Sequence, residues 1–348
     1  MPELVLPEKT SWEAIAESGL PAVIYGMGNG ADRVLDEFAR LGIAVKGVCA
    51  GDDFVRGQSF RGFTVKKLSD FTGDFTVCIA FGTHRPEVIE HLLEVKKQYS
   101  TLVPVVPVYG DEIFNRDFVS EHMDELNRAY SLFSGKSREI FSSCVSFMLS
   151  GDIDTLISSE TPKQEAFDDI LKLGDNESYL DIGAYKGDTV EEFLHYCRGS
   201  YSHIIAAEPD GKNFASLVKN CSELERFTAV NAAVSDRNGF IKFAARGGRH
   251  SSVSPCEKEI PCVTADIFCE GREVTYIKID AEGAEIPVLR GAVKTIKANK
   301  PKLNIALYHK SRDIFEIPLL VNEFCPDYRF EIRHHPCIPC WDMNLYCV

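Results

Sequence analysis

Two carboxylates and two glycines are spaced so that they could hold a small charged ligand. They lie in the stretch 179–189, which reads Y-L-D-I-G-A-Y-K-G-D-T. The apolar residues around Asp181 predict a buried strand, Gly183 and Gly187 predict a tight turn, and a helical pattern begins after Asp188. Glycine suits such a turn because it accepts unusual backbone angles and lets a ligand approach the main chain. The spacing differs from the dinucleotide pattern G-x-G-x-x-G, and the carboxylates would repel a pyrophosphate but attract a cation.

Further carboxylates follow other predicted strands. Glu208 comes directly after the strand 203–207, and Asp280 closes the strongly apolar strand 274–279. In a parallel sheet, ligands collect at the carboxyl ends of the strands, so these side chains are expected at one edge. Glu208 lies 25 residues after Gly183, where a carboxylate could accept hydrogen bonds from both ribose hydroxyls.

With these stretches in view, the sequence resembles the FkbM family of S-adenosylmethionine-dependent methyltransferases. The resemblance covers about 165–348 and is carried by Y-L-D-I-G-A-Y-K-G-D-T, A-A-E-P-D, N-A-A-V-S-D and Y-I-K-I-D-A-E-G-A-E-I-P-V-L-R-G-A. It implies a seven-stranded Rossmann-like class I methyltransferase sheet, S-adenosylmethionine as cofactor, and O-methylation of a hydroxyl on a sugar, glycan or small natural product. The whole chain is therefore expected to be α/β, with this fold preceded by a smaller doubly wound domain.

The resemblance also implies roles for individual residues. The residues around the glycine turn would hold the methionine part of the cofactor, Glu208 the ribose, and Ala232 and Ala233 would lie beside the adenine. Asp280 would face the sulfonium and the methyl acceptor. The complete predicted cofactor set is Asp181, Gly183, Ala184, Gly187, Asp188, Thr189, Glu208, Pro209, Ala232, Ala233 and Asp280.

Methylation of an alcohol needs a base near the methyl group. The candidates are Asp280, His309, Glu282 and Glu285, and the first three are our predicted catalytic residues. His309 follows the strand 303–307, and a neutral imidazole is suited to the task. For Glu282 and Glu285 a structural role at a helix start is an equal alternative. Asp280, Glu282 and His309 could also bind a divalent metal, but we predict none.

The N-terminal part predicts a separate α/β domain over 1–110, followed by a helical linker over 111–162 and the methyltransferase domain over 163–348. Its turn at Gly26, Gly28 and Gly30 matches G-x-G-x-x-A. No acidic residue ends the second strand of this domain. Two interpretations of these glycines therefore stay open: they bind a nucleotide or sugar nucleotide, or they only allow a helix to pack on its strand. A non-catalytic nucleotide-binding protein with a methyltransferase-like fold is the alternative function, and an NAD-dependent oxidoreductase has weaker support.

The composition of the chain restricts which partners and which cellular compartment we expect for the protein. The 348 residues carry a formal net charge of -14, which argues against nucleic acid and anionic membranes as partners. There is no signal-peptide pattern and no apolar run of membrane-spanning length, and the twelve cysteines lie mostly in apolar stretches. We therefore expect a cytoplasmic protein. The segment 337–340, C-I-P-C, next to two histidines is too compact for a tetrahedral zinc site, so a hairpin loop is preferred. Loops at 244–256 and 309–318 are expected to shape the acceptor cleft.

Overall fold

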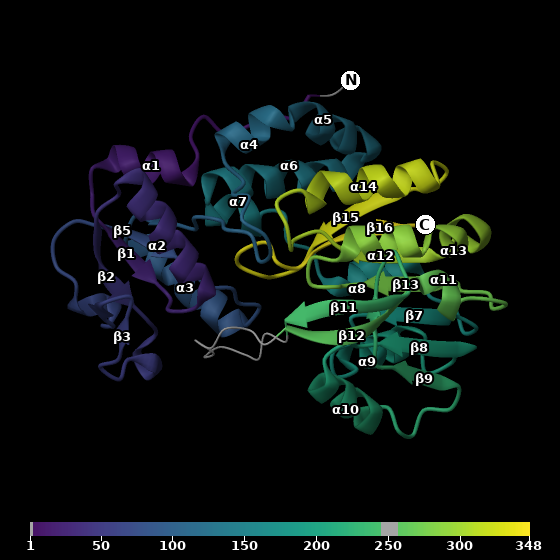
Figure 1. Cartoon of the computed structure of the whole chain (residues 1–348). Coiled ribbons are helices and arrows are strands. Elements are labelled where there is room, and N and C mark those ends of the chain that lie inside the picture. The colour runs from purple at the N-terminus through teal and green to yellow at the C-terminus, as the bar shows by residue number, and fades with distance from the viewer. Residues whose placement is uncertain (1–2, 245–256) are drawn as a thin grey trace. The chain divides into compact units, whose positions relative to one another are not determined.

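The computed structural model describes residues 3–244 and 257–348, which divide into two compact units (Figure 1). The first unit comprises 1–161 together with the short segments 308–311 and 334–343. The second comprises 162–307, 312–333 and 344–348. No helix among the described residues has both the length and the apolar character needed to cross a membrane.

The first unit is built on a four-stranded sheet with the order β2-β1-β5-β6, in which every pairing is parallel. Its central strands are short apolar runs that are buried on both faces, as expected when helices cover a parallel sheet. The strands of this sheet are β1 (Ala22–Tyr25), β2 (Val45–Cys49), β5 (Thr76–Ile79) and β6 (Thr101–Leu102), and a separate two-stranded sheet is formed by β3 (Ser59–Phe60) and β4 (Phe63–Thr64).

The helices of the first unit include α4 to α7, which lie within the segment 111–162 that the sequence predicts to be helical. Helix α2 begins at the glycine turn after β1, and its apolar stripe, including Val34 and Phe38, packs into the same cluster as Ile24 and Val48 of the sheet. The helices are α1 (Ser11–Ser18), α2 (Asn29–Leu41), α3 (Pro86–Gln98), α4 (Arg116–Glu121), α5 (Met123–Leu132), α6 (Gly135–Ser150) and α7 (Ile153–Ile157), with 3-10 turns at Asp52–Phe54 and Leu68–Asp70.

The second unit contains the predicted seven-stranded sheet, with the order β15-β16-β14-β13-β7-β8-β9. The pairings from β14 to β9 are parallel, and β16 runs antiparallel to β14. The predicted Rossmann-like methyltransferase fold is thus confirmed. The strands are β7 (Ser178–Ile182), β8 (His203–Ala207), β9 (Phe227–Val230), β13 (Tyr276–Ile279), β14 (Lys302–Ala306), β15 (Phe330–His334) and β16 (Met343–Cys347).

A smaller sheet with the order β10-β12-β11 accompanies the large one, and β11 and β12 pair antiparallel. Its strands are β10 (Ala233–Val234), β11 (Gly239–Ala244) and β12 (Glu257–Val263). The helices of this unit are α8 (Lys163–Glu165), a π-helical turn (Ala166–Leu171), α9 (Asp188–Tyr196), α10 (Gly211–Asn220), α11 (Ala265–Phe268), α12 (Glu285–Gly291), α13 (Val293–Asn299) and α14 (Asp313–Phe324).

The sequence predicted two loops, 244–256 and 309–318, that shape an acceptor cleft. Most of the first, 245–256, lies outside the described residues. The second is not a loop throughout its predicted range, because α14 already begins at Asp313 and contains Pro318. The apolar face of this helix is buried, and its packing outweighs the backbone hydrogen bond that Pro318 cannot donate.

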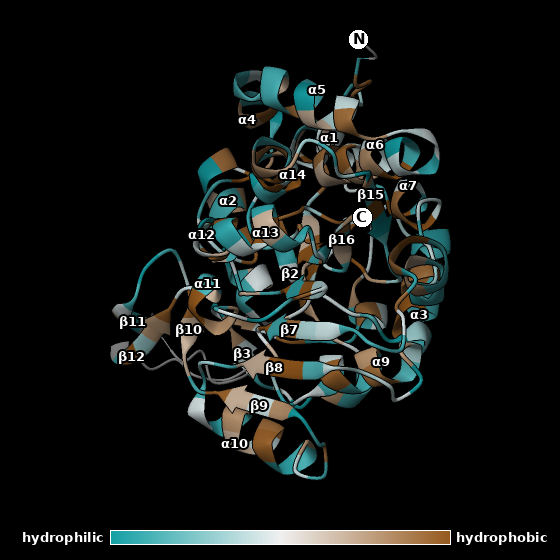
Figure 2. Ribbon diagram, turned by 90° about the vertical axis from the view of Figure 1, so that its right-hand side faces the viewer, coloured by the Kyte–Doolittle hydropathy of each residue, from teal (hydrophilic) through white to brown (hydrophobic). Residues whose placement is uncertain are grey.

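Stacked aromatic rings fix the centre of the large sheet. Tyr179 of β7 lies 4.8 Å from Tyr276 of β13 and 4.4 Å from Phe193 of α9, measured between ring centroids. All three side chains are almost fully buried, and each contributes about 1.5 to 3 kcal/mol by leaving water. Neighbouring β8 is apolar over most of its length (Figure 2). This packing holds β7, β13 and the start of α9 in a fixed arrangement, and the carboxylates of interest come from these elements.

Candidate active site

The glycine turn after β7 is required by its neighbours. Gly183 has a φ of +85° and Gly187 a φ of +94°, in the left-handed region that favours glycine. A Cβ on Gly183 would lie 1.8 Å from the carbonyl oxygen of Asp280, so the end of β7 and the end of β13 touch through the missing side chain. The amides of Gly183 and Ala184 donate to the Ala207 carbonyl at 3.0 and 3.1 Å. The turn is therefore held by both neighbouring strands. The sequence also predicts that a ligand can approach its main chain.

Asp181 lies beneath this turn and is completely buried. Its Oδ2 accepts a hydrogen bond from the Thr189 hydroxyl, while its Oδ1 has no hydrogen-bond partner among the described residues. Burial raises the pKa of Asp181 to about 6, although nearby Lys278, Thr189 and Tyr179 act in the opposite direction. A buried carboxylate with an unsatisfied oxygen is costly, so it is expected where a site needs negative charge.

Glu208 closes β8 and is also buried. Its carboxylate accepts the amides of Tyr185 at 3.0 Å and Asp210 at 2.8 Å, one on each oxygen. Burial raises its pKa, and these two amides partly offset the effect. Each carboxylate oxygen can accept a second hydrogen bond, so the group keeps the capacity to bind a diol. The arrangement fits the predicted contact with ribose hydroxyls.

Other predicted cofactor residues occupy neighbouring positions. Asp188 is exposed and opens α9, and Pro209 separates Glu208 from the N-cap of α10. Ala232 and Ala233 are buried where β10 begins. The side-chain amide of Asn231, just before them, donates to the Glu208 carbonyl at 2.8 Å, which ties this segment to the end of β8. The segments predicted to hold ribose and adenine are thus adjacent in the structure.

Sequence reasoning overlooked Lys278 as a site residue. Its side chain is only 11% exposed, and its Nζ lies 3.3 Å from Oδ2 of Asp280, whose side chain is 31% exposed. Burial would lower the pKa of Lys278, but Asp280 and Asp181 together raise it. The signal was present in the sequence, since a lysine inside the apolar strand T-Y-I-K-I needs a partner to be buried.

The remaining acids near Asp280 separate into different roles. Glu285 is fully buried and accepts the amides of Ala281 at 2.8 Å and Gly283 at 3.3 Å, which is the structural role considered for it. Glu282 is exposed and sits in the turn with a φ of +51°.

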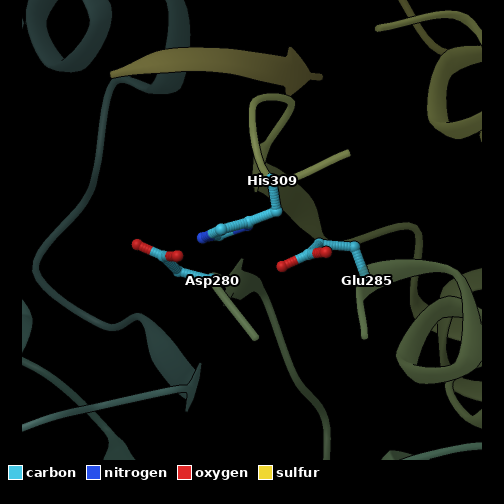
Figure 3. Close-up of side chains that lie close together, drawn as sticks. All are labelled: Asp280, Glu285 and His309. Carbon is cyan, nitrogen blue, oxygen red and sulfur yellow. The ribbon is translucent and has the colours of Figure 1, made fainter. Parts of the chain in front are cut away.

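Figure 3 shows the side chains of Asp280, Glu285 and His309 close together. Each offers one ligand atom, and these atoms lie within 4.8 Å of one another. His309 follows β14 by three residues. The sequence suggested Glu282 in this group, and the structure has Glu285 instead. Such a set of side chains can accept a proton from a hydroxyl or hold a divalent cation.

The two histidines beside the C-I-P-C segment, and Arg333 before them, have partners inside the protein. Arg333 is buried and contacts Glu165 at 2.8 Å, and the rings of His334 and His335 hydrogen-bond backbone carbonyls. Among the described residues, the cysteines at 337 and 340 join no group with metal-ligand geometry. These stretches therefore read as structural.

The N-terminal glycine turn packs closely against β5. A Cβ on Gly30 would lie 2.8 Å from the carbonyl oxygen of Ala80, and one on Gly26 would lie 3.1 Å from the same atom. Gly28, the N-cap of α2, has open space on its Cβ side. Close helix packing thus accounts for two of the three glycines, and a nucleotide at this turn stays a prediction.

The sequence and the fold are similar to those of known proteins. Residues 181–332 match the profile of a protein family described as the methyltransferase FkbM domain. No curated protein matches the sequence. A crystal structure of methyltransferase FkbM from Methylobacillus flagellatus KT is similar with a TM-score of 0.73 and 19% identity, over 99% of this chain and 94% of that one. At this identity the similarity shows the fold.

Two further structures are similar over about half of this chain. Fibrillarin from Aeropyrum pernix, in complex with natively bound S-adenosyl-L-methionine, has 12% identity and a TM-score of 0.34, covering 51% of this chain and 69% of that one. An rRNA methylase from Streptococcus thermophilus has 10% identity and a TM-score of 0.35, covering 54% and 96%. These scores are too low to support an argument about this chain.

Proposed function

We propose that this protein is a methyltransferase that transfers the methyl group of S-adenosylmethionine to a hydroxyl of a sugar, glycan or small natural product, because residues 181–332 match the profile of the methyltransferase FkbM domain. The observation that carries this proposal is the row of carboxylates at the carboxyl ends of β7, β8 and β13, which suits a ligand with a positive sulfonium and a positive ammonium.

The residues present fit that cofactor. Glu208 is a buried carboxylate with hydrogen-bonding capacity left for the ribose, and Asp181 has an oxygen without a partner beneath the glycine turn. Bound there, the cofactor supplies an electrophilic methyl group. The chain supplies alignment, because an in-line displacement depends mainly on holding the two reactants at the right distance and angle.

Asp280 and His309 are the residues that we propose for the acceptor hydroxyl. Asp280 has one oxygen near Lys278, so its carboxylate is better placed to orient the hydroxyl than to take its proton. His309 is assigned the role of general base, since a neutral imidazole can accept a proton near neutral pH. Glu282 is exposed and is a weaker candidate.

We also propose that the reaction takes place in a reducing compartment such as the cytoplasm. The eleven cysteines within the described residues are free and buried, where they act as small apolar side chains.

Calorimetry with S-adenosylhomocysteine tests the proposal. The full chain should bind one equivalent and show a thermal shift at saturating ligand. Absence of both heat and shift would reject the cofactor assignment. The acceptor class is tested separately, by incubating the chain with methyl-labelled S-adenosylmethionine and pools of sugars, sugar nucleotides, glycans and hydroxylated natural products. Label that appears only on nitrogen or carbon atoms would reject O-methylation while leaving the cofactor assignment intact.

A further inference from the structure

Lys278 is a buried cation for which the proposed function has no role yet. It lies in the middle of β13, between the apolar residues Ile277 and Ile279, and its side chain is 11% exposed. A lysine is almost never buried without a compensating partner, because removing an ammonium from water is expensive. Its neighbours therefore indicate why it is there.

The sheet places three charged side chains on one face. Lys278 is the register partner of Asp181 on the parallel strand β7, so the two side chains leave the sheet on the same side. Asp280 follows Lys278 by two residues, and its carboxylate Oδ2 lies 3.3 Å from the ammonium. Two residues earlier on each strand, the same face carries the stacked pair Tyr179 and Tyr276.

The solvent exposure of these three charged side chains increases from Asp181 through Lys278 to Asp280. Asp181 is completely buried, Lys278 is nearly so, and the side chain of Asp280 is 31% exposed. The cation thus separates a hidden carboxylate from one that reaches the open edge of the sheet. Two carboxylates and one ammonium leave a single net negative charge.

Other groups face Asp181 from every element packed against it. Thr189 and Asp188 come from α9, Tyr179 from β7, Tyr276 from β13 and Cys221 from the end of α10. Lys278 is the only cation among them in the described structure. The hydroxyl of Thr189 can donate to an ionised carboxylate, but it cannot balance the charge. Lys278 is therefore the group whose charge stabilises ionised Asp181.

We propose that Lys278 is a positioning residue of the cofactor site, which holds Asp181 in its ionised form at neutral pH so that the base of the glycine turn attracts a cationic ligand. The inference rests on the proposed function and assigns a task to a residue that touches neither the cofactor nor the acceptor. It identifies the ligand class by charge, as a molecule with an ammonium or sulfonium group.

The pKa of Asp181, raised by burial to about 6 in spite of Lys278, supports this geometry. Without the ammonium, the same burial would keep the carboxyl protonated to a higher pH. Affinity for a cationic ligand should then appear only in more alkaline solution.

The experiment is the pH profile of S-adenosylhomocysteine binding, measured by calorimetry from pH 5 to 8.5 on the full chain and on Lys278→Met. The unmodified chain should lose affinity below about pH 6, by up to tenfold for each pH unit. In Lys278→Met this midpoint should rise by at least about one pH unit, so that binding is roughly tenfold weaker at pH 7 and recovers towards pH 8.5. A midpoint that stays in place would overturn the inference.

Lys302→Met is the matched control. Lys302 begins β14, and its Nζ lies 2.6 Å from buried Glu177, which precedes β7 at the opposite edge of the same sheet. Removing this ammonium also leaves a buried carboxylate without its cation, but away from the glycine turn. The pH profile of binding should be unchanged in Lys302→Met. If its midpoint moved as in Lys278→Met, a general loss of stability would explain both and the inference would fail.

If Lys278→Met does not fold, the inference is tested with Asp181→Asn and with the double variant Asp181→Asn/Lys278→Met. With Asp181 neutral, the profile should lose its midpoint near pH 6, and the lysine substitution should add no further pH dependence. A retained midpoint in Asp181→Asn, or a new one in the double variant, would refute the role of Lys278. Failure of the unmodified chain to bind at any pH would instead refute the proposed function.

Discussion

Replacing Asp181 by asparagine should stabilise the protein while weakening its cofactor binding. The pKa of Asp181 is raised from 3.8 to about 6, mainly by burial. Between these pH values the folded state holds a proton that the unfolded state has lost, so stability falls as pH rises through this window and the full cost remains above pH 6. At about 1.4 kcal/mol per pH unit, this cost is about 3 kcal/mol at neutral pH.

Asparagine is nearly isosteric with aspartate and can still accept the hydrogen bond from Thr189. The expected gain is therefore up to about 3 kcal/mol at pH 7.5, reduced because Lys278 loses one of the three carboxylates that raise its pKa, the others being Asp280 and Glu192. For a unit of this size the upper bound corresponds to a rise in Tm of roughly 6 to 12 °C. The gain should shrink as the pH is lowered from 7.5 to 5.

Scanning calorimetry is the appropriate assay. Both tryptophans, Trp12 and Trp341, belong to the first unit, so their fluorescence would follow the wrong part of the chain. Glu177→Gln is the control, for which we expect a change in Tm of the opposite sign. Burial alone would raise the pKa of Glu177, but the Gly174 amide, Lys302 and Thr275 outweigh it and lower the pKa, so this substitution should destabilise at pH 7.5. A lower Tm in Asp181→Asn would show that the buried carboxylate is fully compensated and that the reasoning is wrong.

Three further substitutions test other parts of the site. Glu208→Ala should weaken S-adenosylhomocysteine binding by about 1.5 to 3 kcal/mol in calorimetry, whereas exposed Glu223→Ala should leave it unchanged; equal affinities would mean that Glu208 does not bind ribose. Gly183→Ala should lower the free energy of unfolding by more than about 3 kcal/mol or prevent folding, because its Cβ would overlap a backbone oxygen. Gly199 has a φ of +73° but open space around it, so Gly199→Ala should lower the free energy of unfolding by only about 1 to 2 kcal/mol in denaturant titration. If the two cost the same, the close approach is not the reason for the glycine. His309→Ala should lower the rate of methyl transfer to an acceptor found by screening by about 10²- to 10⁴-fold with unchanged S-adenosylhomocysteine affinity; a normal rate would exclude it as base.

Much of the fold was predictable because local signals and burial agree. The strands that were correctly placed are short apolar runs bounded by glycine or acidic residues, such as Ser178–Ile182 and Tyr276–Ile279. The motif around Asp181 also predicted a strand, a turn and a helix in the right order. The segment 309–318 was expected to be a loop, but α14 begins at Asp313, and the burial of its apolar face stabilises the helix in spite of Pro318.

The site was predictable at the level of strands but less so at the level of side chains. Glu208 and Asp280 were expected at strand ends, and they are found there. The sequence grouped Glu282 with His309, but the turn at 281–284 points Glu282 outwards and brings Glu285 in, which depends on backbone angles that a residue pattern does not specify. Lys278 was missed because its partner Asp181 is almost a hundred residues away and becomes a neighbour only through strand register.

The position of β16 has a consequence for biosynthesis. This strand is the last in chain order, yet it is inserted between β14 and β15, and all five of its residues are buried. While the ribosome is still making the segment before it, β14 and β15 have no strand between them and each presents an unpaired edge. Completion of the sheet must therefore wait until Met343–Cys347 has emerged from the exit tunnel, so a nascent chain stalled before that point is a natural client for chaperones.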